Sequence, residues 1–328
     1  MTNIPFLFWK DPREKNIFTI LNPEVSKIKE PDISEEGFLL FPFQRNEAGF
    51  KFKGSITQVA KLDIQFQMIH PNQTAHSNPP DSYKTLVNQA IDKIEKGFMQ
   101  KVVLARSSTQ GLDASFDISH YFEDLCILHP NALVYCLSLD QDIWIGATPE
   151  IYIQKQNETY ITHALAGTVE QSFKIPFGAK EIEEHDLVKN YIVDVLTKNK
   201  VSHLKVSNST ELITGKLKHL INEIRFCSPD ILKIIKELHP TPAVCGTPFQ
   251  ESYDYIIRHE NLNREFYSGF LGPIYNPQNF SFWVNLRCAK ICNPLITFFA
   301  GAGIVRNSKA NDEWQETEHK MNALRECL

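Results

Sequence analysis

Closely spaced cysteines are missing from this chain of 328 residues. Its seven cysteines are odd in number and scattered, and none belongs to a CxxC pair. Neither a disulfide framework nor a zinc site is therefore indicated. Unpaired thiols suit a reducing compartment, so we expect a cytoplasmic protein.

Long apolar runs and clusters of one charge are missing as well. No uninterrupted apolar segment approaches the roughly 20 residues of a membrane-spanning helix. The start, MTNIPFLFWKDPRE, has neither a basic region nor a small-residue cleavage site, so we do not expect a signal peptide. With a formal net charge of −5 and no basic run, nothing favours nucleic acid or a membrane as a partner.

A succession of strand and helix patterns is present after residue 80. Residues 1–80 carry little pattern and end in a polar stretch, HPNQTAHSNPPDS, typical of an exposed connection. Beyond it, short strand-like segments are joined by turns, with helices between groups of them, which predicts an α+β fold with mainly antiparallel sheets. Strands are expected at KVVLARSS, ALVYCLSL, DIWIGAT, EIYIQK, TYITHALAG, YSGFLGPIY and FWVNLRCAKI, and helices over 179–199 and near the C-terminus.

The helix expected over 179–199 carries a carboxylate next to its apolar stripe. Val188, Ile192 and Leu196 belong to this stripe, and Glu184 lies one turn before Val188. A core-facing carboxylate needs a compensating charge. Alternatively, Glu184 lies in the frayed first turn, where a glutamate suits the helix dipole and meets solvent.

The C-terminal helix raises the same question. An apolar stripe that begins at Trp314 runs beside a charged stripe of Glu313, Glu316 and Lys320. In one interpretation Glu316 and Lys320 are an i,i+4 ion pair on a solvated face, worth roughly 0.2–0.5 kcal/mol. In the other, Glu316 and Glu184 converge on a hard cation such as Mg²⁺, which prefers carboxylates and water. The spacing does not decide between them.

Two further segments suggest contact with an anion. The GAG at 301–303 follows LITFF and predicts a bare backbone loop whose N–H groups can approach an anion closely. It is not a dinucleotide fingerprint, because Arg306 replaces the third glycine of GxGxxG. In the strand expected at FWVNLRCAKI, Arg287 lies on the face opposite Leu286, where its guanidinium needs either an intramolecular or a ligand carboxylate.

Lys101 and Glu150 lie at the ends of expected strands. Lys101 begins KVVLARSS, and Glu150 ends IGATPE. Each could be a surface residue, and the spacing alone does not bring them together. The pattern by itself therefore indicates an α+β protein with several carboxylates in unusual places.

Nine segments together resemble those of the chorismate-utilising enzymes, which include anthranilate, aminodeoxychorismate, salicylate and isochorismate synthases. They follow in family order from about residue 80 to the C-terminus, whereas residues 1–80 carry none. The resemblance implies two mainly antiparallel sheets packed face to face with helices outside. It also implies one intertwined domain with a divergent part (1–80) and a chorismate-binding catalytic region (81–328). The segments are KVVLARS, IGATPE, HALAGT, KEIEEHDLVKNYI, LKHL, LHPTPAVCGTP, REFYSGFLGPI, FWVNLRCAKI and GAGIVRNSKANDEWQETEHK.

The resemblance also implies roles for individual residues. Glu184 and Glu316 correspond to the Mg²⁺ ligands of the family, with Glu313 as a supporting carboxylate. Lys101 corresponds to a base that activates water, and Glu150 to a general acid. The substrate-binding positions it implies are Arg287, Tyr267, Gly301, Ala302, Gly303, Lys320, His219, Gly167 and Thr168.

Within this family the chain is most similar to the isochorismate synthases. Ala166 in ALAGT stands where aminodeoxychorismate synthases usually carry a nucleophilic lysine, and anthranilate synthases generally lack a lysine at the position of Lys101. The resemblance therefore implies a monomer that converts chorismate to isochorismate with Mg²⁺, without a glutaminase subunit. A salicylate synthase and a non-catalytic chorismate-binding protein are the alternatives.

Overall fold

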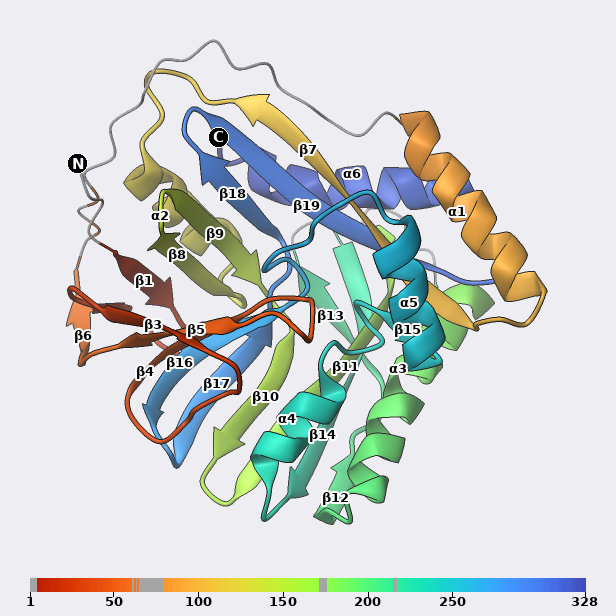
Figure 1. Ribbon diagram of the computed structural model, residues 1–328, viewed down its shortest axis with the longest axis horizontal. Coiled ribbons are helices and arrows are strands. Elements are labelled where there is room, and N and C mark those ends of the chain that lie inside the picture. The colour runs from red at the N-terminus through yellow and green to blue at the C-terminus, as the bar shows by residue number, and fades with distance from the viewer. Residues whose placement is uncertain (1–4, 61, 63, 65–79, 171–175, 215–216) are drawn as a thin grey trace.

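Two antiparallel β-sheets form the framework of the protein (Figure 1). The computed structural model describes residues 5–60, 62, 64, 80–170, 176–214 and 217–328. The first sheet contains, in spatial order, β15 (Gly246–Thr247), β7 (Lys101–Gly111), β19 (Leu295–Ile304), β18 (Cys288–Cys292), β9 (Asp142–Thr148), β8 (Leu133–Leu139), β1 (Leu7–Lys10), β2 (Ile17–Ile20) and β6 (Ile56–Val59). The second contains β12 (Ser202–Val206), β14 (Leu217–Cys227), β11 (Thr159–Glu170), β10 (Ile151–Gln156), β17 (Asn279–Val284), β16 (Phe270–Asn276), β4 (Gly37–Phe41), β5 (Gly49–Lys53) and β3 (Glu24–Ile28), with β13 (Thr210–Thr214) paired to β14.

Six helices in the described residues cover the outer faces of the sheets. On the first sheet, one apolar cluster joins β8 and β9 to α2 and α6, and another joins β7 and β19 to α1 and α5. On the second, α3 and α4 cover β10, β11 and β14. The helices are α1 (Pro80–Glu95), α2 (Ile118–Leu128), α3 (Ala179–Lys198), α4 (Ile231–Leu238), α5 (Phe249–His259) and α6 (Ala310–Arg325). The expected fold class is thus confirmed.

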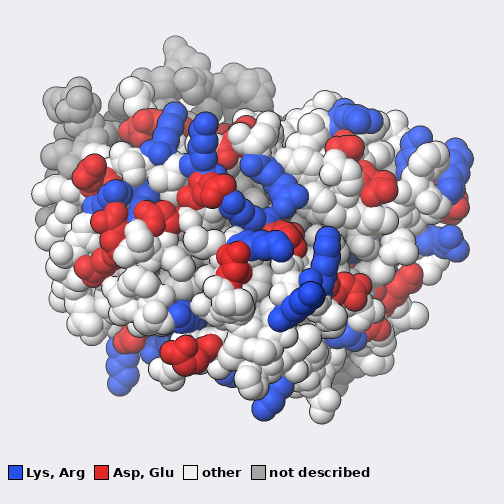
Figure 2. All heavy atoms as spheres, turned by 60° about the horizontal axis from the view of Figure 1, so that its bottom comes forward, with Lys and Arg blue, Asp and Glu red and all other residues white. Residues whose placement is uncertain are grey.

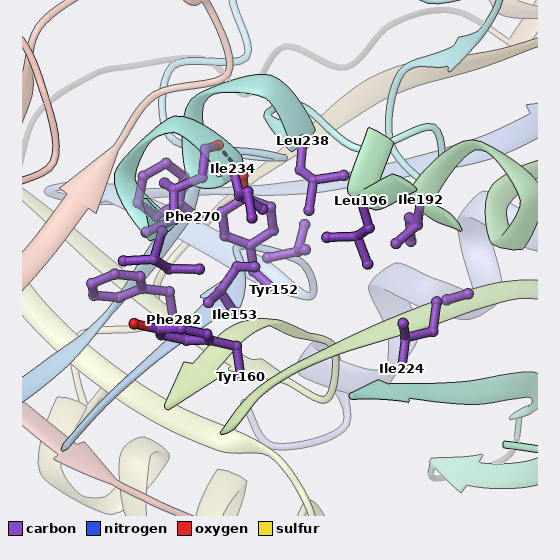
Figure 3. Packing of buried hydrophobic residues seen from close by; sticks show 14 of the residues in the cluster. Tyr152, Ile153, Tyr160, Ile192, Leu196, Ile224, Ile234, Leu238, Phe270 and Phe282 are labelled. Carbon is purple, nitrogen blue, oxygen red and sulfur yellow. Dashed lines mark hydrogen bonds between the residues drawn. The ribbon is translucent and has the colours of Figure 1, made fainter. Parts of the chain in front are cut away.

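The core lies in layers, and alternation along the strands decides which side chain enters which layer. In β4, Phe38 and Leu40 point into the cluster between the two sheets, whereas Leu39 and Phe41 point into the cluster under α3 and α4. Figure 3 shows this outer cluster, in which Tyr152 lies among aliphatic side chains of both helices. Burial of both sheet faces makes strands such as GFLLF continuously apolar.

Residues before position 80 contribute strands to both sheets. β1, β2 and β6 extend the first sheet from β8, and β3, β4 and β5 extend the second from β16. These strands are only four or five residues long, and several are buried on both faces, which explains their weak sequence pattern. The polar stretch expected to be an exposed connection lies outside the described residues, except for its last three positions, which begin α1.

The single strand expected at FWVNLRCAKI is wrong. β17 ends at Val284 in the second sheet, and β18 begins at Cys288 in the first. Asn285 fixes the crossing, because its amide accepts from Tyr135 Oη at 2.7 Å and donates to the Phe266 carbonyl at 2.9 Å. Arg287 has φ of +46°, a left-handed conformation that ends the extended backbone. Alternation of apolar residues continued across this crossing, so the pattern did not show it.

The charged surface follows the mixed composition. The face in Figure 2 intersperses acidic and basic side chains over its whole area. Among the residues that the structure describes, no helix combines the length and the apolar character that crossing a bilayer requires.

Candidate functional site

A pocket lies between the two sheets, where β7 and β19 approach β11, α3 and α6. It encloses a cavity of about 70 Å³, and about 670 Å³ of space not filled by atoms when the open solvent at its mouth is included. Most of the residues singled out from the sequence line it: Glu150, Gly167, Thr168, Glu184, His219, Tyr267, Arg287, Gly301, Gly303 and Lys320. Lys101, Ala302, Glu313 and Glu316 do not line this pocket.

The glycines at 301 and 303 belong to a strand, so the loop expected there is wrong. In β19, Gly301 pairs with Ala105 and Gly303 with Val103. The N–H groups of Ala105 and Val103 bond elsewhere, to Glu260 and to the Cys245 carbonyl. In an antiparallel ladder the backbone groups of both glycines must therefore point away from β7.

This edge of β19 faces side chains and not another strand. β18 pairs with β19 only as far as Phe298, and Lys320 Nζ donates to the Gly301 carbonyl at 2.8 Å. The backbone N–H groups of Gly301 and Gly303 thus point away from β7, as expected of groups that meet an anion, whereas the Gly301 carbonyl already accepts from Lys320. Ala302 alternates to the opposite face, where its side chain packs in the cluster of α1 and α5.

Glycine at position 303 allows α3 to approach β19 closely. A Cβ on Gly303 would lie 2.8 Å from Cδ of Glu184 and 3.1 Å from Cε of Lys101. Lys101 Nζ is fully buried and lies 3.0 Å from Glu184 Oε1. Burial raises the pKa of Glu184, but the ammonium groups of Lys101 and Lys180 outweigh burial and hold that pKa below its ordinary value. Glu184 is therefore a core-facing carboxylate with compensating charges and not a frayed, solvated one.

Glu150 and Arg287 reach the pocket from two adjacent crossings between the sheets. β9 ends at Thr148 in the first sheet and β10 begins at Ile151 in the second, so Glu150 lies in the crossing. The Glu150 carbonyl accepts from Val284 N–H at 3.0 Å, and the Arg287 carbonyl accepts from Ala147 N–H at 3.0 Å. The backbone thus ties the two crossings together.

Burial keeps the Glu150 side chain neutral over much of the pH range. It raises the pKa of Glu150 to about 8, although the positive charges of Lys101 and Lys320 oppose this shift. Glu150 lines the pocket together with Lys320 and Glu184, and Lys101 Nζ lies 3.0 Å from Glu184 Oε1. Lys101 and Glu150, which the spacing could not connect, therefore belong to one region.

Arg287, His219 and Thr168 form a hydrogen-bonded row along the pocket. Arg287 Nη2 donates to His219 Nε2 at 2.9 Å, so His219 Nδ1 carries the proton and donates to Thr168 Oγ1 at 3.0 Å. Burial, the Arg287 guanidinium and Lys320 hold the pKa of His219 well below its usual range. Burial also lowers the pKa of Arg287 to about 10, which leaves it charged at neutral pH. Gly167, at φ of +72°, forms the bulge of β11 before Thr168.

The remaining carboxylates lie on α6, each beside a lysine. Glu316 Oε1 contacts Lys320 Nζ at 2.7 Å, and Glu313 Oε1 contacts Lys180 Nζ at 2.6 Å. Burial and the charge of Glu316 raise the pKa of Glu313 to about 7, against the attraction of Lys180. Glu313 is fully buried, so it, and not the half-buried Trp314, begins the buried stripe of this helix.

The carboxylates on α3 and α6 suit a hard cation. Their donors are all oxygens, the chemistry that Mg²⁺ prefers, and Glu313 Oε2 is buried without a hydrogen-bond partner. Within the described residues, no three acidic, histidine or cysteine side chains already meet closely enough to enclose an ion. To hold a cation, Glu184 would have to turn away from Lys101, and Glu316 away from Lys320.

Sequence reasoning missed Lys180 and the apolar lining of the pocket. Lys180 lies one helical turn before Glu184, so the i,i+4 spacing placed it on the same face and could have indicated it. The apolar lining carried no chemical signal that distinguished it from core. It comprises Val103, Pro149, Leu165, Ala166, Ala243, Val244, Leu286, Phe299 and Ala300.

A concave pocket lined by ionisable side chains with shifted pKa values is the usual candidate for a functional site. The chain belongs to the family described as "Chorismate binding enzyme", whose model matches residues 51–328.

Two relatives with curated names are 30% and 29% identical to this chain over the aligned residues. The chain is 30% identical over 260 residues to a salicylate biosynthesis isochorismate synthase of Pseudomonas aeruginosa, covering 75% of this chain and 54% of that protein. It is 29% identical over 283 residues to the isochorismate synthase EntC of Escherichia coli, covering 82% of this chain and 70% of that protein. The chain thus spans about half the length of the first relative.

Solved structures with the same fold cover the whole chain. A 2,3-dihydroxybenzoate-specific isochorismate synthase from Bacillus anthracis superposes with a TM-score of 0.82 at 23% identity, covering 100% of this chain and 96% of that one. Anthranilate synthase component I from Streptococcus pneumoniae superposes with a TM-score of 0.69 at 17% sequence identity. The match covers 99% of this chain and 91% of that one. At these identities the likeness establishes the fold alone.

Proposed function

We propose that this protein catalyses the Mg²⁺-dependent isomerisation of chorismate to isochorismate. The observation that carries the proposal is that one buried region contains both Glu150, whose pKa is raised to about 8, and the fully buried side chain of Lys101. A general acid and a general base are what water addition with loss of a hydroxyl group requires. The pocket also presents Ala166 and no amine at the position of a nucleophilic lysine, and the named relatives are isochorismate synthases.

Chorismate carries two carboxylates, and the pocket offers a cationic or N–H donor group for each. Arg287 and Tyr267 bind the ring carboxylate in this proposal, with His219 and Thr168 beside the ring. Lys320 and the backbone N–H groups of Gly301 and Gly303 bind the enolpyruvyl carboxylate. Because the pocket has two fixed donor groups, we expect a monoanion to bind less well than the dianion chorismate.

Glu184 and Glu316 would hold Mg²⁺, with Glu313 as supporting carboxylate. Bound there, the cation would supply positive charge for the ring carboxylate of the substrate and fix its orientation. To bind Mg²⁺, Glu184 must break its ion pair with Lys101. A metal site there would explain why carboxylates gather near the start of α3 and of α6.

The proton transfers fall to two side chains of the protein. Lys101, in its neutral form, removes a proton from a water molecule whose oxygen bonds to C2. Glu150 gives its proton to the hydroxyl group that leaves C4 as water, and the ring double bonds shift between these carbons. One water enters and one departs, so substrate and product are isomers. A positioned acid and base contribute typically ~10²–10⁴-fold each to the rate.

We also propose that residues 1–80 and 81–328 act as one unit. The strands before residue 80 extend both sheets and leave no separate layer. A monomer without a glutaminase subunit suits a reaction that uses water and not ammonia.

The product of the reaction tests the proposal. Purified protein is incubated with chorismate and Mg²⁺, with and without ammonia, and the products are separated by chromatography. We expect isochorismate, independent of ammonia. Salicylate with pyruvate would identify a salicylate synthase, anthranilate would identify an ammonia-using enzyme, and binding without turnover would leave a chorismate-binding protein.

Lys101→Ala tests the assignment of the base. We expect the variant to lose isochorismate formation by about 10²–10⁴-fold while still binding chorismate in the presence of Mg²⁺, measured by calorimetry. Unchanged turnover in this variant would remove Lys101 from the mechanism.

A further inference from the structure

The edge of β7 behind the pocket is only partly covered by a strand. β15 pairs with Lys101 and Val102 alone, and the Cys245 carbonyl accepts from Val103 N–H at 2.8 Å. Past this point, no other strand of the described chain pairs with this edge of β7. A buried backbone N–H or C=O without a partner costs roughly 1–3 kcal/mol, so the next groups of β7 need partners.

Two side chains from the segment after α5 supply these partners. Glu260 Oε2 accepts from Ala105 N–H at 2.8 Å, and Arg264 Nη2 donates to the Val103 carbonyl at 2.7 Å. The two side chains also bind each other, with Arg264 Nε 2.6 Å from Glu260 Oε1, and both are 2% exposed. The buried ion pair thus presents the acceptor and the donor that a neighbouring strand would have presented.

The same ion pair joins three parts of the pocket wall. Arg264 Nη1 donates to the carbonyl of Val244, which lines the pocket beside Val103. The Arg264 carbonyl accepts from Tyr267 N–H at 2.8 Å, which fixes the turn that carries Tyr267. Through the ladder of β7 and β19, the pair also governs the position of Gly301 opposite Ala105.

We propose that Glu260 and Arg264 are positioning residues that replace a missing strand on β7 and so hold Lys101 and the glycines of β19 in register with the pocket. Neither side chain lines the pocket, so both act through the backbone. This inference rests on the proposed function for its kinetic test, but its structural test does not depend on any activity.

A purely structural ion pair would behave differently. Replacing a buried ion pair by apolar residues of similar size is often neutral or stabilising. Here the two side chains also satisfy backbone groups of β7, so if Glu260 and Arg264 served stability alone, Glu260→Met/Arg264→Met would be less stable, but the folded variant would convert chorismate like the parent. A positioning pair predicts a folded variant whose β7 edge opens and whose turnover falls.

Hydrogen exchange of residues 101–106 and steady-state kinetics with chorismate measure these two effects. In the double methionine variant we expect the Ala105 amide to exchange at least about tenfold faster, because its acceptor is gone. We expect kcat to fall by about 10²-fold with a smaller change in KM, since a misplacement near 1 Å acts on the chemical step. Parent-like exchange and parent-like kcat in a folded double variant would overturn the proposal.

A control variant and several single variants keep the test decisive. Lys51→Met removes another fully buried ammonium, paired with Asp32 at 2.8 Å on the second sheet, and should leave β7 exchange and kcat unchanged. Glu260→Gln retains an acceptor for Ala105 and should keep more of kcat than Glu260→Met. If the double variant does not fold, Arg264→Lys decides, because lysine cannot reproduce the guanidinium fork that binds Glu260 and the carbonyls of Val103 and Val244. Parent-like kcat and exchange in that variant would overturn the proposal. If the parent does not convert chorismate, the proposed function fails, and the exchange of Ala105 in the double variant still tests whether the pair covers the edge of β7: parent-like exchange would overturn that part of the proposal.

Discussion

Glu150 illustrates how one buried side chain acquires an unusual proton affinity. It lies where the chain crosses between sheets, and among the residues that the structure describes it forms no ion pair. Burial favours its neutral form, while Lys101 and Lys320 are close enough to weaken that preference and too distant to reverse it. The result is a carboxyl group that can donate a proton at neutral pH.

Glu150→Gln should abolish most of the activity and change its pH dependence. The glutamine has the same shape but no proton to give, so we expect kcat to fall by about 10²–10⁴-fold. In the parent, kcat/KM, which reports the ligand-free protein, should fall as pH rises through about 8, where Glu150 ionises. Rate measurements from pH 6 to 10 check this expectation. A parent profile without a decline in that range would contradict the role of Glu150 as acid.

The same shift gives a stability test with a defined sign. The pKa of Glu150 is raised from 4.5 to about 8 in the folded protein. Between these values the folded state keeps a proton that the unfolded state has released, so the free energy of unfolding decreases as pH rises across this window. Glu150→Gln should remove this part of the pH dependence, whereas Glu183→Gln, at an exposed position on α3, should preserve it.

At the scale of elements, regular helices and hairpins could be predicted from the sequence, but the crossings could not. The helix over 179–199 was confirmed because its buried residues, His185, Val188, Ile192 and Leu196, recur at helical spacing. The hairpin of β10 and β11 was confirmed because QKQNET is rich in turn residues. The crossing at Asn285 was missed because buried residues alternate through it in both sheets. Since Glu150 and Arg287 lie on crossings, the sequence alone could not place them.

The approach of β19 to α3 gives a prediction at this scale. Gly303→Ala would push Glu184 and Lys101 apart, because its Cβ would overlap the Glu184 carboxylate. We expect at least about a tenfold loss of kcat/KM with a cooperative unfolding transition retained. Kinetics and thermal melting measure the two effects.

Gly111→Ala is the matched control for this substitution. Gly111 lies at the far end of β7, opposite Leu295, and an added Cβ there would meet nothing within 4 Å. It should therefore keep parent kinetics. Equal kinetics in Gly303→Ala and Gly111→Ala would show that the close approach of β19 and α3 has no functional role.

At the scale of the whole molecule, the pocket depends on every layer. The first sheet supplies Gly301 and Gly303, the second supplies Thr168 and His219, and the outer helices supply Glu184 and Lys320. These residues are distant in sequence, so a ligand that contacts them all would hold the two sheets and the helices against one another. Binding should therefore be visible as global stabilisation.

Magnesium alone should raise the melting temperature of chelator-treated protein. A ligand that binds only the folded state stabilises it by about 2.7 kcal/mol at a concentration a hundred times its Kd. In Glu316→Gln one carboxylate of the proposed site is gone, so most of this stabilisation and the Mg²⁺ dependence of turnover should be lost. Asp312→Asn changes an exposed carboxylate on the same helix and should keep the parent response. If Glu316→Gln and Asp312→Asn respond to Mg²⁺ alike, Glu316 is no ligand, and the charge on α6 serves only to hold Lys320 against the Gly301 carbonyl.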